Sequence, residues 1–275
     1  MTAADLPRLR LHGRTALVTG AAGGIGQAVS RRLADEGATV ICADLNEVAV
    51  RESARNLGNS SVGIALDVAD ETGVRGVIEL AERLGGLDVL CNVAGIAGPQ
   101  VPAEHTAVED WDLTFAVNTR GPFLLCKHAA RQLRRKRGNI INVASALALI
   151  GWRSESAYGP SKAGLVQFTK SAALDLAPDI RVNAVLPGAV RTPMITSILE
   201  GSADQEATLA AYGAIHPYGS KLLQPSAIAD AVIFLASDDA SFITGACVPV
   251  DAGLLATGRS AAERHGNGEH ALEVP

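Results

Sequence analysis

The sequence predicts an α/β fold, a single domain in which helices cover both faces of a doubly wound sheet of about seven parallel strands. Two observations predict it. Short apolar runs rich in Val, Ile and Leu alternate with longer segments of helical periodicity, which is the pattern of repeated strand–helix–strand units. The 275 residues, 48% of them hydrophobic, suffice for one large core.

Seven of the apolar runs are expected to be strands: residues 15–18, 39–43, 62–66, 87–91, 139–143, 180–186 and 247–250. Helices are expected over residues 26–36, 71–84, 108–117, 121–136, 158–176 and 225–236. Two of the helix starts carry local signals. Asp70 precedes the second helix as its cap, with Glu71 in the first turn. Pro160 is accepted in a first turn, so the fifth helix is expected to begin near Tyr158.

Three stretches lie outside this alternation. Residues 189–224 follow the sixth expected strand as a long segment of small and apolar residues. Ligands of such sheets bind beyond the carboxyl ends of the strands, so we expect a lid over a substrate site there. Residues 257–275 are polar and contain glycine, and we expect a flexible tail. Residues 1–12 are expected to form an N-terminal arm, which leaves 13–256 as the catalytic domain.

Composition and charge exclude several classes of function. The net charge is -5, and the one basic cluster, Arg134–Arg137, is expected to end a helix, so we expect no nucleic-acid partner. No run of 18 apolar residues marks a membrane span, so no membrane partner is expected. Cys42, Cys91, Cys126 and Cys247 lack metal-binding spacing. We therefore expect free thiols in a reducing compartment, no metal site and a cytoplasmic protein.

A glycine-rich loop, Thr19-Gly-Ala-Ala-Gly-Gly-Ile-Gly26, stands between the first expected strand and the first helix. Glycines there let the backbone turn tightly and let a pyrophosphate approach the helix N-terminus. Asp44 ends the second expected strand, where its carboxylate would accept hydrogen bonds from ribose hydroxyls and repel a 2′-phosphate. No Arg or Lys lies in the loop or beside Asp44, which favours NAD over NADP. In the alternative interpretation, Asp44 only caps the turn that contains Asn46.

Tyr158 and Lys162 are four positions apart and therefore share a face of the fifth expected helix. Ser145 lies thirteen residues upstream of the tyrosine. Oxidation of a secondary alcohol needs a base near neutral pH, and a phenol, with a pKa of about 10, becomes one only beside a positive charge. Each motif alone also occurs on exposed helices and in turns. The ordered set indicates a hydride-transfer site.

This set resembles the short-chain dehydrogenase/reductase family over about residues 12–255. The resemblance implies a Rossmann-like fold and a catalytic set of Asn118, Ser145, Tyr158 and Lys162. Tyr158 would exchange the proton while Lys162 binds the nicotinamide ribose. Ser145 would polarise the substrate oxygen, and Asn118 would anchor a relay water. The cofactor contacts implied are Gly20, Gly24, Ile25, Gly26, Asp44, Leu45, Asp67, Val68, Asn92, Ala94, Gly95, Tyr158, Lys162, Pro187, Gly188, Val190 and Thr192.

The expected substrate pocket is mostly apolar. Its residues are Ile96, Leu147, Trp152, Glu155, Ala189, Met194, Ile195 and Ile198. Such a lining favours a small to medium hydrophobic or cyclic substrate over a sugar or a charged acid. Two alternatives remain, because Glu155 could lie at the rim and face water, and Trp152 could pack in a subunit interface.

The leading hypothesis is an NAD-dependent oxidoreductase that interconverts a secondary alcohol and a ketone. One alternative is an NADPH-dependent 3-oxoacyl-acyl-carrier-protein reductase, which Asp44 disfavours. The other is a non-catalytic NAD-binding redox sensor, which the intact catalytic set disfavours. The segments 243–245 and 250–253 resemble the closing segment of the family, which forms a subunit interface in many relatives. A homotetramer is therefore expected, with a dimer as the second choice.

Overall fold

The computed structural model describes residues 9–200 and 202–257, so most of the expected arm and all of the expected tail beyond residue 257 lie outside the described residues. One sheet of seven parallel strands runs through the molecule in the order β3-β2-β1-β4-β5-β6-β7. The strands are β1 (Thr15–Thr19), β2 (Thr39–Asp44), β3 (Val62–Ala65), β4 (Val89–Asn92), β5 (Asn139–Val143), β6 (Arg181–Pro187) and β7 (Cys247–Val250). The predicted fold class is confirmed.

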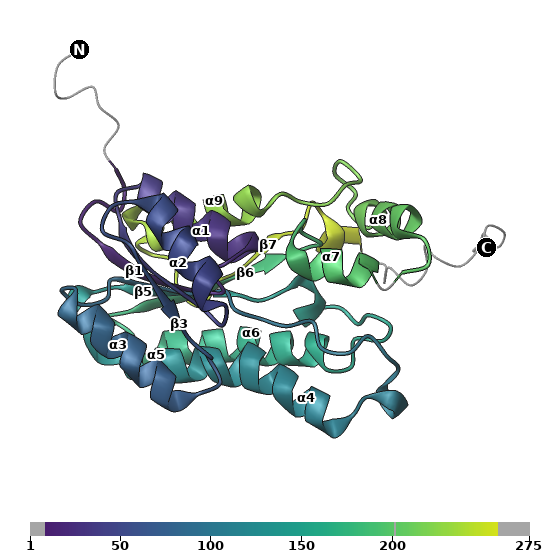
Figure 1. The fold of residues 1–275 in the computed structure, drawn as a ribbon, viewed down its shortest axis with the longest axis horizontal. Coiled ribbons are helices and arrows are strands. Elements are labelled where there is room, and N and C mark those ends of the chain that lie inside the picture. The colour runs from purple at the N-terminus through teal and green to yellow at the C-terminus, as the bar shows by residue number, and fades with distance from the viewer. Residues whose placement is uncertain (1–8, 201, 258–275) are drawn as a thin grey trace, which may run out of the picture.

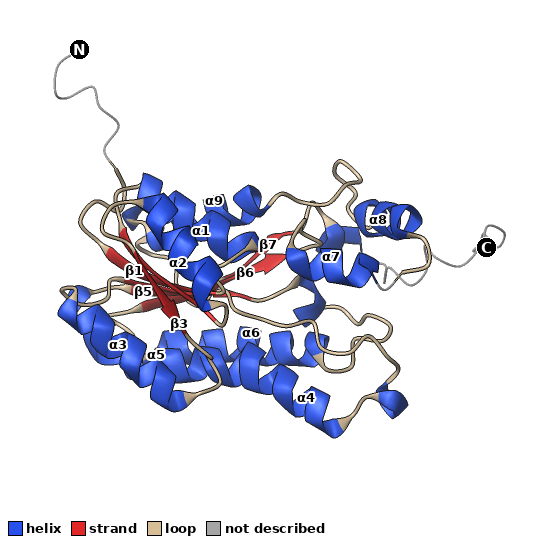
Figure 2. Ribbon diagram, viewed as in Figure 1, coloured by secondary structure: helices blue, strands red, loops and turns tan. Residues whose placement is uncertain are grey.

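Helices cover both faces of the sheet (Figures 1 and 2). One face carries α1 (Gly24–Asp35), α2 (Glu47–Leu57) and α9 (Pro225–Ala236), and the other carries α3 (Glu71–Arg83), α5 (Gly121–Lys136) and α6 (Tyr158–Asp175). Besides short 3₁₀ turns, the described chain also contains α4 (Val108–Phe115), the π-helix η2 (Ala116–Arg120), α7 (Pro193–Glu200) and α8 (Gln205–Ala214). The six predicted helices are present within two residues at each end, whereas α2, α7 and α8 were not predicted. In the described part of the chain, no helix is both long and apolar enough to cross a membrane.

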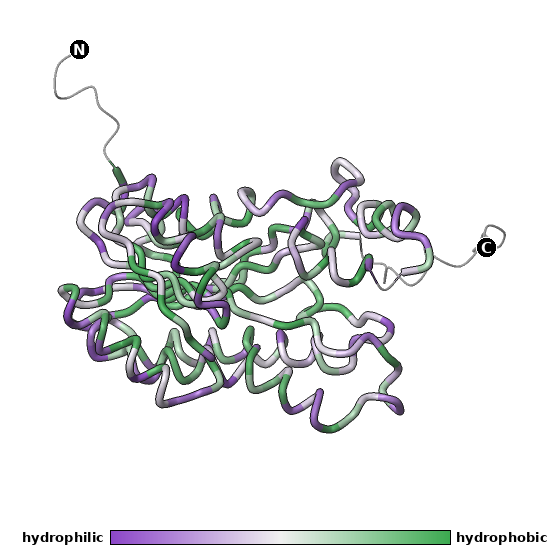
Figure 3. The backbone as a smooth tube through the Cα atoms, in the orientation of Figure 1, coloured by the Kyte–Doolittle hydropathy of each residue, from purple (hydrophilic) through white to green (hydrophobic). Residues whose placement is uncertain are grey.

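The core lies in two layers, one on each side of the sheet. Successive strand residues point to opposite faces, so Val18 packs toward α1 and α9 while its neighbour Leu17 packs toward α3 and α5. The central strands are buried on both sides and read as continuous apolar segments, which Figure 3 shows in green. Cys42, Cys91 and Cys126 are buried free thiols, as expected.

The strand order reverses between β1 and β4. The chain passes from β1 outward to β2 and β3, then returns to β4 and continues in the opposite direction to β7. Two loops therefore diverge at the carboxyl ends of β1 and β4 and leave a crevice between them. The Thr19 hydroxyl fixes this edge, because it accepts hydrogen bonds from the backbone N–H groups of Val93 and Ala94, each at 3.1 Å.

Candidate active site

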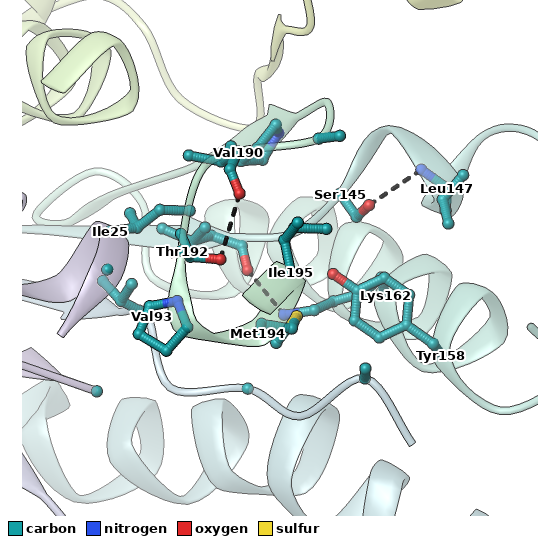
Figure 4. A pocket seen from close by; sticks show the side chains of 18 of the residues that line it. Ile25, Val93, Ser145, Leu147, Tyr158, Lys162, Val190, Thr192, Met194 and Ile195 are labelled. Atoms are coloured by element: carbon teal, nitrogen blue, oxygen red, sulfur yellow. Dashed lines mark hydrogen bonds between the residues drawn. The ribbon is translucent and has the colours of Figure 1, made fainter. Parts of the chain in front are cut away.

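A cavity of about 510 Å³ opens at this edge of the sheet. Its walls come from the segments that follow β1, β2, β4, β5 and β6, together with α7 (Figures 1 and 4). Most of the residues predicted from the sequence line it: Gly20, Gly24, Ile25, Gly26, Asp44, Ala94, Gly95, Ser145, Leu147, Trp152, Glu155, Tyr158, Lys162, Pro187, Gly188, Ala189, Val190, Thr192, Met194, Ile195 and Ile198. The fold therefore brings the two predicted sites, for cofactor and for substrate, into one continuous space.

The glycine loop forms one end of the cavity. No side chain caps α1 at Gly23, so the backbone N–H groups of its first turn remain available to an anion. Gly20 has φ +68, and a Cβ there would lie 2.9 Å from Ala94 Cα. A Cβ on Gly26 would lie only 2.0 Å from the carbonyl oxygen of Gly20. The loop is thus folded on itself more tightly than any residue with a side chain permits.

Gly26→Ala is expected to destabilise the protein by about 3 kcal/mol or more, because the new methyl group would overlap the backbone of Gly20. Gly23→Ala is the matched control. Gly23 has extended backbone angles, and its Cβ would meet Pro193 Cγ at an ordinary 3.6 Å, so a loss below about 1 kcal/mol is expected. Urea unfolding of the two variants measures the difference. Equal midpoints would contradict the tight loop geometry.

Asp44 faces the cavity from the end of β2. One carboxylate oxygen accepts a hydrogen bond from the backbone N–H of Ala22, and the other from that of Asn46, both at 3.0 Å. Asp44 therefore does cap the turn at Asn46, and it also joins that turn to the glycine loop. Each oxygen keeps further acceptor capacity. Lys162 is the only Lys or Arg among the described residues that line the cavity.

Four predicted cofactor contacts do not line the cavity. The side chain of Leu45 is 73% exposed, and Val68 packs against Gly121. Asp67 accepts a hydrogen bond from the N–H of Ala69, two residues along the chain. Asn92 is buried and donates its amide to Asn142 on β5. Asn92 therefore ties two strand ends together beneath the cavity, and the contacts of all four with a cofactor stay predictions.

Tyr158 is the first residue of α6, as its neighbour Pro160 predicted. Lys162 lies one turn further on and is only 3% exposed, with its Nζ 5.8 Å from the centre of the tyrosine ring (Figure 4). The ammonium donates a hydrogen bond to the carbonyl of Val143 at the end of β5, at 3.0 Å. Ser145 follows that strand, and its Oγ accepts a hydrogen bond from the N–H of Leu147. That contact leaves the hydroxyl proton of Ser145 to donate, and it faces Tyr158.

Burial dominates the acid–base behaviour of this site. It raises the pKa of Tyr158 to about 12, while a hydrogen bond with Ser145 lowers that pKa and the charge of Glu155 raises it further. Burial also lowers the pKa of Lys162 to about 8. Attraction between Lys162 and a phenolate, which the sequence predicts, lowers the pKa of Tyr158. Desolvation, which depends on the folded structure, raises the same pKa. An additional positive charge is needed to make Tyr158 a base near neutral pH.

Asn118 connects the loop after β4 to α6 but does not line the cavity. It lies in η2, a single π-helical turn between α4 and α5, and is fully buried. Its amide donates to the carbonyl of Ile96 and to Ser161 Oγ, while its oxygen accepts from the N–H of Ile96. A Cβ on Gly95 would lie 3.1 Å from both Asn118 Oδ1 and Lys162 Nζ, which places these two side chains around one glycine. Ile96, predicted in the substrate pocket, also lies outside the cavity lining.

The other end of the cavity is mostly apolar. Leu147 lines it from the segment between β5 and α6, and Met194 and Ile195 line it from α7 (Figure 4). Trp152 lines it from the same segment as Leu147. Glu155 lines it as well, so this carboxyl group belongs to the pocket. Sequence reasoning missed Gln100, which also lines the cavity and donates a hydrogen bond to Glu155 Oε1 at 2.9 Å. No local pattern marks Gln100, because it lies in an irregular loop after β4.

The two ends of segment 189–224 lie side by side, because residues 189–191 pair with Leu223. The N–H of Leu223 donates to the carbonyl of Ala189 and the carbonyl of Leu223 accepts from the N–H of Arg191, so Val190 forms a parallel bridge with Leu223. His216 is fully buried beside them, where its Nε2 accepts the N–H of Ala189 at 3.0 Å and its Nδ1 donates to the carbonyl of Lys221 at 2.8 Å. Burial lowers the pKa of His216, which keeps Nε2 as an acceptor. The segment is therefore closed at its base.

Comparisons with known proteins agree with this geometry. A family model described as enoyl-(acyl carrier protein) reductase matches residues 20–255. The chain is 41% identical to cis-4-hydroxycyclohexanecarboxylate dehydrogenase from Sinomonas cyclohexanicum over 248 residues, which cover 88% of this chain and 97% of the relative. It is 35% identical to a 3-oxoacyl-acyl-carrier-protein reductase from Thermotoga maritima, with 90% and 100% coverage. The crystal structure of levodione reductase superposes with a TM-score of 0.86 at 31% identity and covers 90% of this chain and 100% of that one.

The matched residues include the glycine loop and the tyrosine and lysine of α6, and the matches extend over nearly the whole chain. The protein belongs to the short-chain dehydrogenase/reductase family of oxidoreductases, whose members use NAD or NADP and act on small molecules.

Proposed function

We propose that the protein is an NAD-dependent oxidoreductase that interconverts a secondary alcohol and a ketone on a small to medium hydrophobic or cyclic substrate. One observation carries the proposal. Tyr158, Ser145 and Lys162 line the same cavity as the glycine loop and Asp44, with an apolar wall beyond them. A base, an oxygen-binding hydroxyl and a dinucleotide cradle are the parts that this reaction needs.

The residues at the glycine end fit a dinucleotide. A pyrophosphate would bind at the uncapped N-terminus of α1, and Asp44 would accept hydrogen bonds from the adenosine ribose. Lys162 has three ammonium protons and donates one to Val143, so two remain for the nicotinamide ribose. When bound, NAD supplies the hydride acceptor and, in its oxidised form, the positive charge that favours a phenolate.

Side chains of the protein would hold the substrate oxygen and transfer its hydroxyl proton. Ser145 would turn its hydroxyl proton from Tyr158 to the substrate oxygen, which holds the carbinol or carbonyl in place. Tyr158 accepts the hydroxyl proton during alcohol oxidation and returns it during ketone reduction. Asn118 fixes the loop after β4 against α6 and would hold the water that links Lys162 to solvent.

Two observations support a cyclic substrate. The cavity wall formed by Leu147, Trp152, Met194 and Ile195 is apolar and suits a ring or a short alkyl chain. A relative named for a ring substrate, cis-4-hydroxycyclohexanecarboxylate dehydrogenase, resembles this chain over most of its length. The spacing of Tyr158 and Lys162 disfavours enoyl reduction, because enoyl reductases of the wider family place these residues further apart.

A 3-oxoacyl-acyl-carrier-protein reductase is the second candidate, since a relative with that name covers 90% of the chain. Asp44 counts against the NADPH that this candidate would use, as does the lack of an Arg or a second Lys among the described residues that line the cavity. We propose a homotetramer, with a dimer as the second choice, because Phe242, Leu174 and Phe123 expose large apolar side chains on different helices and loops. Four free cysteines support a reducing compartment such as the cytoplasm.

A substrate panel tests the proposed function. Alicyclic and linear secondary alcohols, their ketones and a 3-oxoacyl thioester are incubated with NAD(H) or NADP(H), and the absorbance of the reduced cofactor is followed. The expected result is turnover of an alicyclic pair with NAD(H) at the highest kcat/KM in the panel. Turnover confined to the thioester with NADPH would contradict the proposal and favour the second candidate.

A further inference from the structure

Glu155 carries a buried oxygen whose purpose the proposed reaction does not explain. It lies three residues before Tyr158, and its backbone carbonyl accepts a hydrogen bond from the N–H of Gly159 in the first turn of α6. Its Oε1 is held by Gln100 from the loop after β4. Its Oε2 is buried in the cavity wall and has no hydrogen-bond partner among the described residues.

An unpartnered carboxyl oxygen is costly in an otherwise apolar wall. No salt bridge joins Glu155 to a cation in the described part of the chain. Gln100 alone does not satisfy the group, because it reaches only one of the two oxygens. Glu155 lines the cavity that contains Tyr158, and its charge acts on that tyrosine. The partner must therefore come from outside the described residues, as a water or as an atom of a bound substrate.

We infer that Glu155 is a specificity-determining residue: as a neutral acid it donates a hydrogen bond from Oε2 to a second oxygen of the substrate, one that accepts hydrogen bonds and lies apart from the reacting carbon. This rests on the proposed function and narrows its substrate class. The preferred substrate is then a cyclic ketone or alcohol that carries a second carbonyl oxygen, rather than a plain alicyclic compound.

The electrostatics of the cavity agree with a neutral acid. Burial raises the pKa of Glu155 from its ordinary 4.5 to about 7, although the hydrogen bond from Gln100 lowers it. The other titratable residues of the cavity lining are Asp44, Tyr158, Lys162 and Tyr212. Below about pH 7 Glu155 is protonated and donates. Above that pH it is ionised, accepts only, and repels an acceptor oxygen, so the preference for a second carbonyl should fall as pH rises.

A matched pair of ketones tests this inference. Cyclohexane-1,4-dione and cyclohexanone share the ring and the reacting group, and only the dione has a second acceptor oxygen. The quantity measured is the ratio of their kcat/KM values with NADH between about pH 6 and pH 8.5, after correction for the two equivalent carbonyls of the dione. The ratio cancels the titration of Tyr158 and Lys162, since both ketones depend on them. A ratio of about tenfold is expected at the acid end, as for one hydrogen bond, with a decline above neutral pH.

Two variants separate the hydrogen bond from the charge. In Glu155→Gln, the amide oxygen still accepts from Gln100 and the amide N–H₂ still donates into the cavity, so the ratio should stay high and lose its pH dependence. In Glu155→Leu, the ratio should fall to about one at every pH. Glu109→Gln on the exposed surface of α4 is the matched control and should behave as the unchanged protein does. Thermal unfolding checks that each variant is folded.

A binding measurement keeps this inference separate from the proposed function. Calorimetric titration of the NAD⁺-loaded protein with each ketone gives a ratio of dissociation constants that needs no turnover. If neither ketone is reduced but the binding ratio still follows Glu155, the inference stands and the proposed reaction is wrong. If both ketones are reduced and Glu155→Leu leaves both ratios unchanged, or if the preference for the dione rises with pH, the assignment of Glu155 is wrong.

Discussion

Tyr158→Phe is expected to lower kcat/KM for both alcohol oxidation and ketone reduction by about 10²–10⁴-fold, the usual contribution of a positioned acid or base. The phenolic oxygen is the only part removed. The ring stays beside Lys162 at the start of α6, and the glycine loop is untouched, so NADH should still bind. Steady-state kinetics on an alicyclic pair and fluorescence titration with NADH measure the two effects.

Tyr218→Phe is the matched control, because this tyrosine is 85% exposed and does not line the cavity. Its rates should equal those of the unchanged protein. Burial raises the pKa of Tyr158 to about 12, so the fraction of phenolate grows with pH below that value. Alcohol oxidation should therefore accelerate from neutral to alkaline pH, with no such rise in Tyr158→Phe. Retention of activity within tenfold in the Phe variant would remove Tyr158 from the mechanism.

Asp44 should give a preference for NADH over NADPH of about a hundredfold or more in kcat/KM, because a 2′-phosphate would meet a carboxylate with no cation nearby. Asp44→Ala is expected to bring this ratio within about tenfold. It also removes two acceptors of backbone hydrogen bonds, from Ala22 and Asn46, so a loss of stability should accompany it. Asp44→Asn removes the charge and keeps the shape, and it is the cleaner of the two variants.

Asp110→Asn controls for net charge alone, since Asp110 is exposed on α4. Calorimetry with NADH and NADPH, together with kcat/KM for each cofactor, gives the ratio for all four proteins. A tighter binding of NADPH by the unchanged protein would overturn the cofactor assignment. A ratio that Asp44→Asn leaves unchanged would move the discrimination to another part of the cavity.

The sheet could be predicted from the sequence because strands buried on both faces leave continuous apolar runs. α2 could not be predicted in the same way. Its inward face buries only Val50, Ser53 and Ala54, which give a weak apolar pattern among charged residues. The one usable signal was its start, where Asn46 accepts a hydrogen bond from Ala49 N–H and Glu47 occupies the first turn. Propensity alone rarely reveals a helix whose contact face is this small.

The placement of the proposed catalytic residues in one cavity could be predicted because their chemistry is tied to fixed spacing. Tyr158 and Lys162 depend only on the repeat of one helix, and the glycine loop depends on its own backbone. Gln100 could not be found, since its contact with Glu155 joins two irregular loops. The π-helical turn at Asn118 adds one residue to a helical repeat and leaves no periodic signal. The pKa shifts of Tyr158 and Lys162 could not be predicted either, because desolvation depends on how the folded chain packs around these side chains.

The closed base of segment 189–224 sets how this protein can change its substrate. His216 and the pairing of Ala189 with Leu223 hold both ends of the segment at fixed positions beside β6. Between these ends the segment also packs on the fold, where Ile215 meets Ala146 and Leu254 and the N–H of Tyr218 donates to Ala252. Lengthening a loop whose ends are already joined adds little entropic cost. A transplanted or randomised sequence in α7 and α8 is therefore expected to reshape the pocket wall that Met194 and Ile195 form, while Tyr158 and Lys162 on α6 keep their positions.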